Sequence, residues 1–280
     1  PLGMLCLSRP IRLLRSGRDC GNDRRKREKM EERLNKWLSR MGVCSRREAD
    51  RLIEAGKVLV DNRPASMGQK VTPGQKVVCN GKMVRVDKSH KPRPVLLAVN
   101  KPRGIVCTTT DKDRAENIVD FLGYPERIYP VGRLDKDSEG LLLMTNQGDL
   151  VNKIMRSGNA HEKEYIVTID KPVTEHFLEQ MAGGILLPEL DQVTRPCKVK
   201  KVERNTFSII LTQGLNRQIR RMCEVCGCQV RRLVRVRIMN IRLGNLRTGA
   251  YRQITKEEYE ELTGLLKDSS SLSIKERKNR

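Results

Sequence analysis

The stretch Pro130-Val-Gly-Arg-Leu-Asp-Lys-Asp-Ser-Glu-Gly-Leu-Leu-Leu-Met-Thr-Asn146 decides how the rest of the chain is interpreted. It places the carboxylate of Asp135 at the end of a polar turn, close in sequence to Arg133. The apolar run at residues 141–144 follows, and we expect it to be a buried strand. A proline and two glycines fix the backbone of the turn, and the strand anchors it. The stretch therefore predicts an acid held by a scaffold, although an isolated Asp near an Arg is more often only solvated.

The composition indicates a polyanionic partner. The chain has 56 lysines and arginines against 34 acidic residues, which gives a formal net charge of +22. A surface with this excess binds nucleic acid by releasing counterions from phosphates, although a basic surface without a partner is the alternative. Only 3% of the residues are aromatic, so stacking on bases must rely on few rings.

Cysteine usage and hydropathy bear on the compartment. The nine cysteines are odd in number and scattered, which favours a reducing compartment over a disulfide framework. No apolar run approaches the roughly 20 residues that span a bilayer. We therefore expect a soluble, cytoplasmic protein with no membrane partner. Import into an organelle is the alternative if the arginine-rich segment at residues 4–29 is a transit peptide.

The sequence predicts two domains joined by a linker. Residues 1–30, which begin with what resembles a cloning remnant, are expected to be a disordered basic arm. A small α/β domain follows at residues 31–89, a linker with two prolines at 90–94, and a larger α+β domain at 95–266. Residues 267–280 are rich in Ser and Lys and are expected to be a disordered tail.

Two short helices open the first domain. Apolar residues at helical spacing predict the first helix, which ends at Gly42. Ser45 and Glu48 form a capping-box pattern that begins the second helix, and Gly56 ends it. Short strands are expected at residues 58–60, 71, 77–78 and 83–86. Three basic side chains of the second helix cannot all face the core and form a predicted ridge, namely Arg46, Arg47 and Arg51.

Strand and helix patterns run through the second domain. Strands are expected at residues 95–99, 141–144, 161–170, 198–202 and 206–211. Helices are expected at residues 117–122, 150–155, 174–181, after Asn216 and at 255–266, the last begun by a capping box. A further strand extends the cationic surface with four arginines, Arg231, Arg232, Arg235 and Arg237.

Polar candidates also occur on one helix and one strand. Asn216 is expected to cap its helix, and Arg217, Arg220 and Arg221 lie on one face of it. A solvated basic face is the plainer interpretation of these arginines. Tyr165 lies on the strand at residues 161–170, where a tyrosine is more often part of the core.

Three cysteines raise the question of a metal, Cys223, Cys226 and Cys228. A Cys-x-x-Cys pair needs a second pair of ligands, and none is suitably placed. His161 and His176 likewise have no partner at the spacing of metal ligands. We expect no metal site.

Several stretches resemble the RNA pseudouridine synthases that act on small- and large-subunit ribosomal RNA. They are the central stretch at 130–146, Asn-Lys-Pro-x-Gly at 100–104, Lys163-x-Tyr165, Asn-Arg-Gln-Ile-Arg-Arg-Met at 216–222 and the stretch 243–255. Residues 33–50 resemble the RNA-binding domain named after the fourth small-subunit ribosomal protein. The resemblance covers about residues 31–266 and is nearest to the large-subunit members.

This resemblance implies an α+β protein. A small α/β RNA-binding domain would stand beside a catalytic domain with a central, mainly antiparallel mixed sheet and a cleft across it. Asp135 would be the catalytic residue, Tyr165 would stack on the target base, and Arg220 would pair with Asp135. The residues expected to bind substrate RNA are Arg133, Lys163, Asn216, Arg217, Arg221, Arg46, Arg47, Arg51 and Lys57.

The implied reaction needs no cofactor, because isomerising uridine to pseudouridine neither adds nor removes atoms. The bond from ribose to the base nitrogen breaks, and the uracil turns over and rejoins through carbon. Asp135 either attacks the anomeric carbon or removes the neighbouring proton, and the sequence leaves both routes open. A guanidinium beside it keeps the acid ionised where water is excluded. The target base must also leave its stack.

Structured RNA is the expected partner, with ribosomal RNA first and transfer RNA second, bound by a monomer. A non-catalytic RNA-binding protein of ribosome assembly is the alternative, and it would not need the set Asp135, Tyr165 and Arg220. A glycosidase or nuclease is disfavoured. Asp135 and Asp137 are near neighbours in a turn, which does not guarantee the set separation of a glycosidase acid pair.

Overall fold

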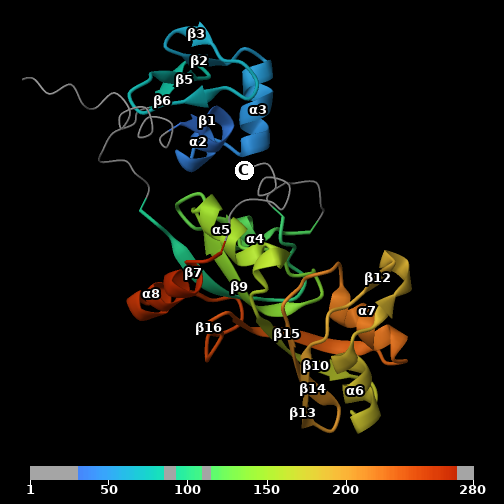
Figure 1. Ribbon diagram of the computed structural model, residues 1–280. Coiled ribbons are helices and arrows are strands. Elements are labelled where there is room, and N and C mark those ends of the chain that lie inside the picture. Colours follow the sequence, from blue (N-terminus) through green and yellow to red (C-terminus); the bar gives the residue numbers. More distant parts are fainter. Residues whose placement is uncertain (1–30, 85–92, 109–114, 270–280) are drawn as a thin grey trace, which may run out of the picture. The chain divides into compact units, whose positions relative to one another are not determined.

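The structure, a computed structural model, describes residues 31–84, 93–108 and 115–269. The chain divides into two compact units, Pro1–Lys91 and Pro92–Arg280 (Figure 1). The division falls inside the linker expected at residues 90–94. The predicted basic arm at 1–30, with its transit-peptide alternative, and residues 270–280 of the predicted tail lie outside the described residues.

The first unit packs two helices against a small sheet. Leu34 and Ile53 from the helices share one core with Val58 and Val77 from the strands. The helices are α2 (Leu34–Arg40) and α3 (Arg46–Glu54). The sheet runs in the order β3 (Arg63–Pro64), β2 (Val58–Val60), β5 (Val77–Cys79), β6 (Lys82–Val84), and β1 (Glu32–Arg33) pairs with β4 (Lys70–Val71).

The expected start and end of α3 are present, with one difference. The Ser45 side chain accepts a hydrogen bond from the backbone N–H of Glu48 at 3.1 Å. The Glu48 carboxylate, however, binds Arg51 at 2.8 Å, where the predicted capping box has it returning to the N-cap backbone. Gly56 has a φ of +67°, the left-handed conformation that ends a helix. All four predicted basic residues of this unit are exposed, Arg46, Arg47, Arg51 and Lys57.

The second unit is built on one mixed sheet, which confirms the predicted fold class. Its strand order is β13-β14-β10-β15-β9-β7-β17, and every neighbouring pair is antiparallel except β9 with β15. The strands are β13 (Lys198–Glu203), β14 (Thr206–Leu211), β10 (Lys163–Ile169), β15 (Val230–Ile238), β9 (Glu139–Thr145), β7 (Leu96–Lys101) and β17 (Tyr251–Gln253). Two short strands extend it, β8 (Tyr129–Pro130) on β9 and β16 (Ile241–Arg242) on β15.

Helices cover both faces of this sheet. The helices are α4 (Ile118–Leu122), α5 (Gly148–Met155), α6 (Glu175–Gly183), α7 (Gln218–Val225) and α8 (Lys256–Leu265), with single turns η2 (Ser157–Asn159) and η3 (Pro188–Leu190) and a hairpin β11 (Leu186–Leu187) and β12 (Gln192–Val193). Helices α6 and α7 share a core with β10 and β14. Along β7 and β9, alternate side chains join a core with α5 and α8 or a core with α4. These two strands are buried on both faces, which explains their uninterrupted apolar sequence.

Strand β7 continues beyond its predicted end at residue 99. Asn100 and Lys101 belong to the strand, and the side chain of Lys101 is fully buried. The apolar pattern stops two residues before the pairing does, because Lys101 still pairs with Gly140 of β9. No helix among the described residues is long and apolar enough to cross a membrane.

Candidate active site

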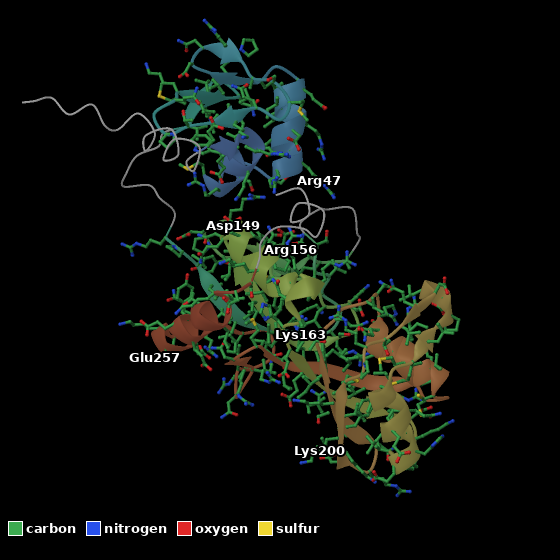
Figure 2. The ribbon with its side chains drawn as sticks, in the orientation of Figure 1. Arg47, Asp149, Arg156, Lys163, Lys200 and Glu257 are labelled. Carbon is green, nitrogen blue, oxygen red and sulfur yellow. The ribbon has the colours of Figure 1, made fainter. Side chains whose placement is uncertain are left out.

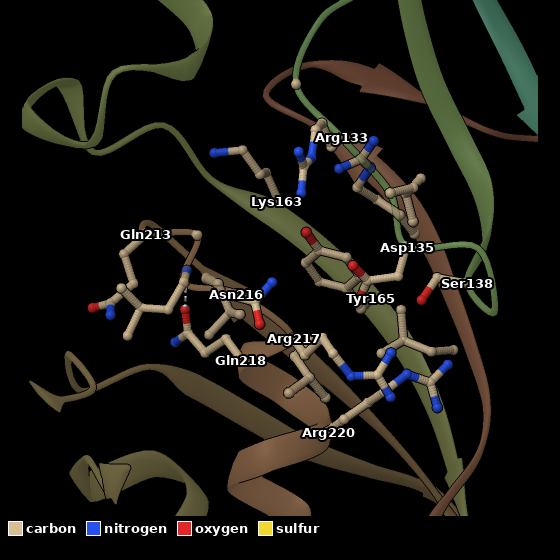
Figure 3. A pocket seen from close by; sticks show the side chains of 18 of the residues that line it. Arg133, Asp135, Ser138, Lys163, Tyr165, Gln213, Asn216, Arg217, Gln218 and Arg220 are labelled. Atoms are coloured by element: carbon tan, nitrogen blue, oxygen red, sulfur yellow. Dashed lines mark hydrogen bonds between the residues drawn. The ribbon is translucent and has the colours of Figure 1, made fainter. Parts of the chain in front are cut away.

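A cavity of about 550 Å³ is lined by the loop before β9, by strands β10 and β15 and by the start of α7 (Figure 3). This volume suits a ligand the size of a nucleoside. Predicted site residues from three separate segments meet here, namely Arg133, Asp135, Lys163, Tyr165, Asn216, Arg217 and Arg220. Seven of the twenty residues that line the cavity were thus predicted site residues, and the structure brings them together.

Burial divides the lining into layers. Arg133, Asn216 and Arg217 are exposed and form the mouth of the cavity. Asp135 and Tyr165 are half-buried. Three lining cations are buried, Arg220 at 9% exposed, Lys163 at 5% and Arg235 at 2%, and the last two form the floor. Polar groups thus extend from the solvent to the bottom of the cavity.

Donors from distant parts of the chain hold the loop that carries Asp135. Each of the next three backbone carbonyls after Asp135 accepts a hydrogen bond. The bonds are Gly104 N to Lys136 O (2.9 Å), Arg220 Nη2 to Asp137 O (3.0 Å) and Lys101 Nζ to Ser138 O (2.8 Å). Because these donors come from β7, the loop after it and α7, the position of the acid depends on the whole sheet.

The predicted ion pair between Arg220 and Asp135 is absent from the described residues. The Arg220 guanidinium donates to backbone carbonyls, those of Asp137 at 3.0 Å and Val230 at 3.4 Å. Burial lowers the pKa of Arg220, and nearby Arg217 adds to this shift. The carboxylates of Asp137 and Asp135 oppose it. Arg220 therefore lies near Asp135, but it holds the loop of this acid in place and does not form an ion pair with its carboxylate.

The prediction that Asn216 caps α7 is wrong. Arg217 occupies the N-cap position with a φ of 50°. The Gln218 side chain accepts a hydrogen bond from the backbone N–H of Leu215 at 3.1 Å. Arg221 donates to the backbone carbonyl of Asn216 at 3.0 Å and forms an ion pair with Glu189. Arg221 is thus engaged within the protein and does not line the cavity.

The register of β10 and β15 determines which side chains form the floor of the cavity. Tyr165 lies directly opposite Arg235 across this antiparallel pair. A register shift beside Tyr165 leaves one extra residue in β15, and such a bulge turns neighbouring side chains toward a site. Figure 2 places Lys163 inside the second unit, whereas Lys200 lies at its rim on the edge strand β13.

The cationic surface predicted on β15 is smaller than expected. Arg232 forms an ion pair with Glu139, and Arg237 forms ion pairs with Glu162 and Glu164. Arg235 is buried in the floor. Of the four arginines, Arg231 is the one that is exposed and forms no ion pair with a described residue. The alternation of the strand turns the others toward acids and the cavity.

The three cysteines at α7 behave as packed thiols. Burial raises the pKa of each of them, most of all that of Cys223. A metal ligand must be a thiolate, so raised pKa values oppose metal binding. The described part of the chain contains no group of three or more His, Cys, Asp or Glu residues that could hold a metal ion.

Two segments of the chain match models of known protein families. Residues 95–225 match the family model described as RNA pseudouridylate synthase, and residues 32–77 match the S4 domain. The chain is 52% identical over 239 residues to the dual-specificity RNA pseudouridine synthase RluF of Escherichia coli K12, covering 85% of this chain and 81% of that protein. This chain belongs to the RNA pseudouridine synthase family.

Other relatives agree with this assignment. The synthase is 35% identical to the ribosomal large subunit pseudouridine synthase B of Bacillus subtilis, over 84% of this chain and 96% of that protein. A crystal structure of a pseudouridylate synthase superposes with a TM-score of 0.60 at 27% identity, covering 82% of this chain and 99% of that one. The predicted resemblance is confirmed, and the chain is an enzyme that acts on RNA.

Two buried cations of the synthase were missed as site residues by the sequence. Lys101 belongs to the Asn-Lys-Pro-x-Gly pattern, and its position directly after an apolar strand was the available signal. Arg235 occurs among other arginines, so a solvated stripe was the natural interpretation. Burial distinguishes it, because a charged side chain is almost never fully buried without a partner or a task.

Replacing Lys101 by Met should slow the reaction more than it destabilises the fold. Methionine matches the length of the lysine but leaves the carbonyls of Pro102 and Ser138 without their donor at 2.8 Å. A shift of the Asp135 loop by about 1 Å costs roughly 10²-fold in rate. Single-turnover assays and thermal unfolding measure the two effects. The control, Lys136→Met, changes an exposed side chain of the same loop, and equal losses in both variants would contradict this role.

The stability of the synthase should depend on pH through Lys163. Burial, reinforced by nearby Arg235, lowers the pKa of Lys163 from 10.5 to about 8. Between these values the unfolded chain binds a proton that the folded chain lacks, so the free energy of unfolding rises with pH there. Relative to Lys163→Met, the wild-type chain should gain roughly 3 kcal/mol across this window. Urea titrations at several pH values measure the difference, and a constant difference would refute the depressed pKa.

Proposed function

We propose that this synthase isomerises a uridine in a stem-loop of large-subunit ribosomal RNA, with transfer RNA as a second substrate class. The observation that carries the proposal is the cavity, in which half-buried Asp135 and Tyr165 lie between a cationic mouth and a cationic floor. The names of the relatives support the RNA class, since one is called dual-specificity and another a ribosomal large subunit enzyme.

Asp135 is the proposed catalytic acid group. Among the described residues that line the cavity it is the only carboxylate, and its loop is held at three successive carbonyls. A fixed carboxylate satisfies the needs of either route, attack on the anomeric carbon or removal of the neighbouring proton. Both routes require the reacting atoms to be held within a few tenths of an ångström, which the loop contacts favour.

Tyr165 is the proposed stacking platform for the flipped base. Its half-buried ring lines the cavity beside the loop of Asp135 and rises from the sheet, where the backbone is paired on both sides. Flipping a nucleotide costs a few kcal/mol. Stacking returns about 1–3 kcal/mol per base, so one tyrosine offsets much of this cost.

The mouth residues are proposed to bind the RNA backbone. Arg133 and Arg217 offer exposed guanidinium groups, and Asn216 adds an amide beside them. Guanidinium pairs with phosphate bidentately, which fixes the strand on either side of a flipped nucleotide. Arg220 is proposed as a positioning residue, since its contacts hold the loop of Asp135. No cofactor is proposed, and one chain carries the complete set.

The first unit is proposed to bind the RNA stem through its basic ridge, Arg46, Arg47 and Arg51, together with Lys57. A variant with all four replaced by Ala should bind a labelled hairpin more weakly. Its plot of log affinity against log salt should be shallower by roughly 3, because about four phosphate contacts are lost. The rate at saturating RNA should stay within a few-fold. Fluorescence anisotropy measures the affinity, with the exposed Arg63→Ala as control.

The RNA target is tested by offering unmodified transcripts. The wild-type chain is incubated separately with large-subunit ribosomal RNA, small-subunit ribosomal RNA and transfer RNA, and pseudouridine is mapped by nuclease digestion and mass spectrometry. We expect conversion at a stem-loop of the large-subunit transcript. Conversion confined to the small-subunit transcript would overturn the proposed target and keep the reaction. Binding without conversion of any of the three transcripts would overturn both proposed substrate classes.

A further inference from the structure

The floor of the cavity holds more positive charge than its partners neutralise. Five of the lining residues are cations, Arg133, Lys163, Arg217, Arg220 and Arg235, whereas Asp135 alone is acidic among the described lining residues. The exposed Arg133 and Arg217 at the mouth are screened by solvent. The buried Arg220 donates to the backbone carbonyls of Asp137 and Val230. Lys163 and Arg235 are more than nine-tenths buried and have no carboxylate partner among the described residues.

The donors of Arg235 are mostly unused. Its Nε donates to the backbone carbonyl of Leu141 at 2.7 Å, and this is the one hydrogen bond that a described residue accepts from it. Its Nη2 is buried and has no partner among the described residues. A guanidinium has five N–H donors, and leaving buried donors unpaired costs free energy. A buried arginine in this state calls for an acceptor that the protein itself does not provide.

Lys163 is in a similar state. Its ammonium group donates to the backbone carbonyl of His161 at 3.1 Å, which occupies one of three N–H donors. Burial and the charge of Arg235 oppose its protonated form, as its lowered pKa of about 8 shows. An anion placed between the two side chains would relieve this repulsion. The geometry of the strands supports one shared acceptor, because Lys163 and Tyr165 are two residues apart on one face of β10 and Arg235 lies opposite Tyr165.

The reaction itself supplies such an anion. When the bond between C1′ and N1 breaks, the electron pair leaves with the uracil, whose negative charge spreads over N1 and the two carbonyl oxygens. When C5 then bonds to C1′, the pair returns, and the proton lost from C5 balances the proton gained at N1. A charge that exists only partway through the reaction is best stabilised by donors already in place.

We propose that Lys163 and Arg235 form an anion site for the departing uracil, in which their N–H groups donate to its carbonyl oxygens. This deepens the proposed function and rests on it, since it assumes a flipped uridine stacked near Tyr165. A phosphate is the less suitable occupant, because the residues proposed to bind the RNA backbone are exposed at the mouth, whereas this pair is buried at the floor. The site is occupied by the neutral base before cleavage and holds it most strongly as the anion.

The test compares two leaving groups. A hairpin with the target uridine is paired with the same hairpin carrying 5-fluorouridine, whose fluorine withdraws electrons and makes the departing base less basic. Single-turnover loss of each nucleoside is followed by nuclease digestion and mass spectrometry. Arg235→Met should slow cleavage of uridine by roughly 10²–10³-fold, the usual effect of losing one such donor. The loss with 5-fluorouridine should be at least about tenfold smaller, since that base needs less stabilisation.

Controls distinguish an anion site from a purely structural role of Arg235, and they distinguish failure of the anion site from failure of the proposed function. Arg242→Met removes an exposed arginine of β16 and should leave both rates within about twofold, as most surface changes do. Equal losses of Arg235→Met with both substrates would overturn the anion site. Wild-type chain that converts neither RNA would instead overturn the proposed substrate. If Arg235→Met does not fold, the two substrates are compared with Arg235→Lys and Lys163→Met instead. Each of these variants should also lose less activity with 5-fluorouridine than with uridine.

Discussion

Replacing Asp135 by Asn should abolish pseudouridine formation and leave RNA binding nearly intact. The amide keeps the shape of the side chain, but it can neither attack the anomeric carbon nor accept the neighbouring proton. Loss of a general base costs roughly 10²–10⁴-fold and loss of a nucleophile costs more, so the single-turnover rate should fall by at least about 10³-fold. Affinity for a labelled hairpin should change by less than about threefold, because phosphate contacts dominate it.

The chain offers a matched control two residues away. The side chain of Asp137 is 56% exposed and forms an ion pair with Arg217 at 4.0 Å. Asp137→Asn keeps the backbone carbonyl that accepts from Arg220, so the loop should stay in place. We expect this variant to retain most of its activity. An active Asp135→Asn, or an inactive Asp137→Asn, would show that the catalytic acid was assigned to the wrong residue.

Local patterns in the sequence predicted the elements well, because their causes are local. Thr174 begins α6 by accepting from the backbone N–H of Phe177 at 3.2 Å, and Thr255 forms the complete capping box of α8. Asn117 caps α4 in the same way. Each of these contacts spans two or three residues. A pattern of this length contains all the atoms that determine the hydrogen bond, so no knowledge of the fold was required.

The residues of the candidate site were predicted in part, and their contacts were predicted less well. The family resemblance placed Asp135, Tyr165 and Arg220 together, and all three line one cavity. The partner of Arg220 was wrong, however, because a backbone carbonyl 83 residues away carries no sequence signal. Only the path of the loop decides whether a guanidinium meets a carboxylate or the carbonyl beside it.

Arg235 shows a second limit of the sequence. Over residues 234–238 of strand β15 the arginines alternate with apolar residues, which is the pattern of a half-solvated strand. The strand instead lies between β10 and β9, and a bulge beside Tyr165 changes which side chains face inward. Burial of Arg235 follows from this pairing between segments far apart in the chain, so periodicity within one segment could not reveal it.

The junction of β9 and β15 is the point where the site depends most on one residue. Here the two strands run parallel, and Gly140 pairs with Arg235. Gly140 has a φ of +101°, a conformation that side chains rarely adopt. A Cβ at this position would overlap the backbone carbonyl oxygen of Arg235 and lie 2.8 Å from its nitrogen. Glycine is therefore needed for both the turn of the chain and the approach of the strands.

Gly140→Ala should destabilise the second unit by roughly 3–5 kcal/mol, because backbone strain and overpacking add together. A typical domain is stable by only 5–15 kcal/mol, so much of its stability would be lost. Urea unfolding followed by far-UV circular dichroism measures the change. The single tryptophan of the chain, Trp37, lies in the first unit, and its fluorescence should report an unchanged transition there.

A second glycine provides the comparison for this effect. Gly183 ends α6 without a positive φ, and a Cβ there would meet no atom within 4 Å. Gly183→Ala should change the stability by less than about 1 kcal/mol, in the stabilising direction, since alanine favours the helix. If Gly140→Ala changed the stability as little as Gly183→Ala, β9 and β15 would have to move apart without a loss of free energy, which would contradict the prediction. The positions of both Asp135 and Arg235 depend on this pairing, so the activity of that variant should fall even where it remains folded.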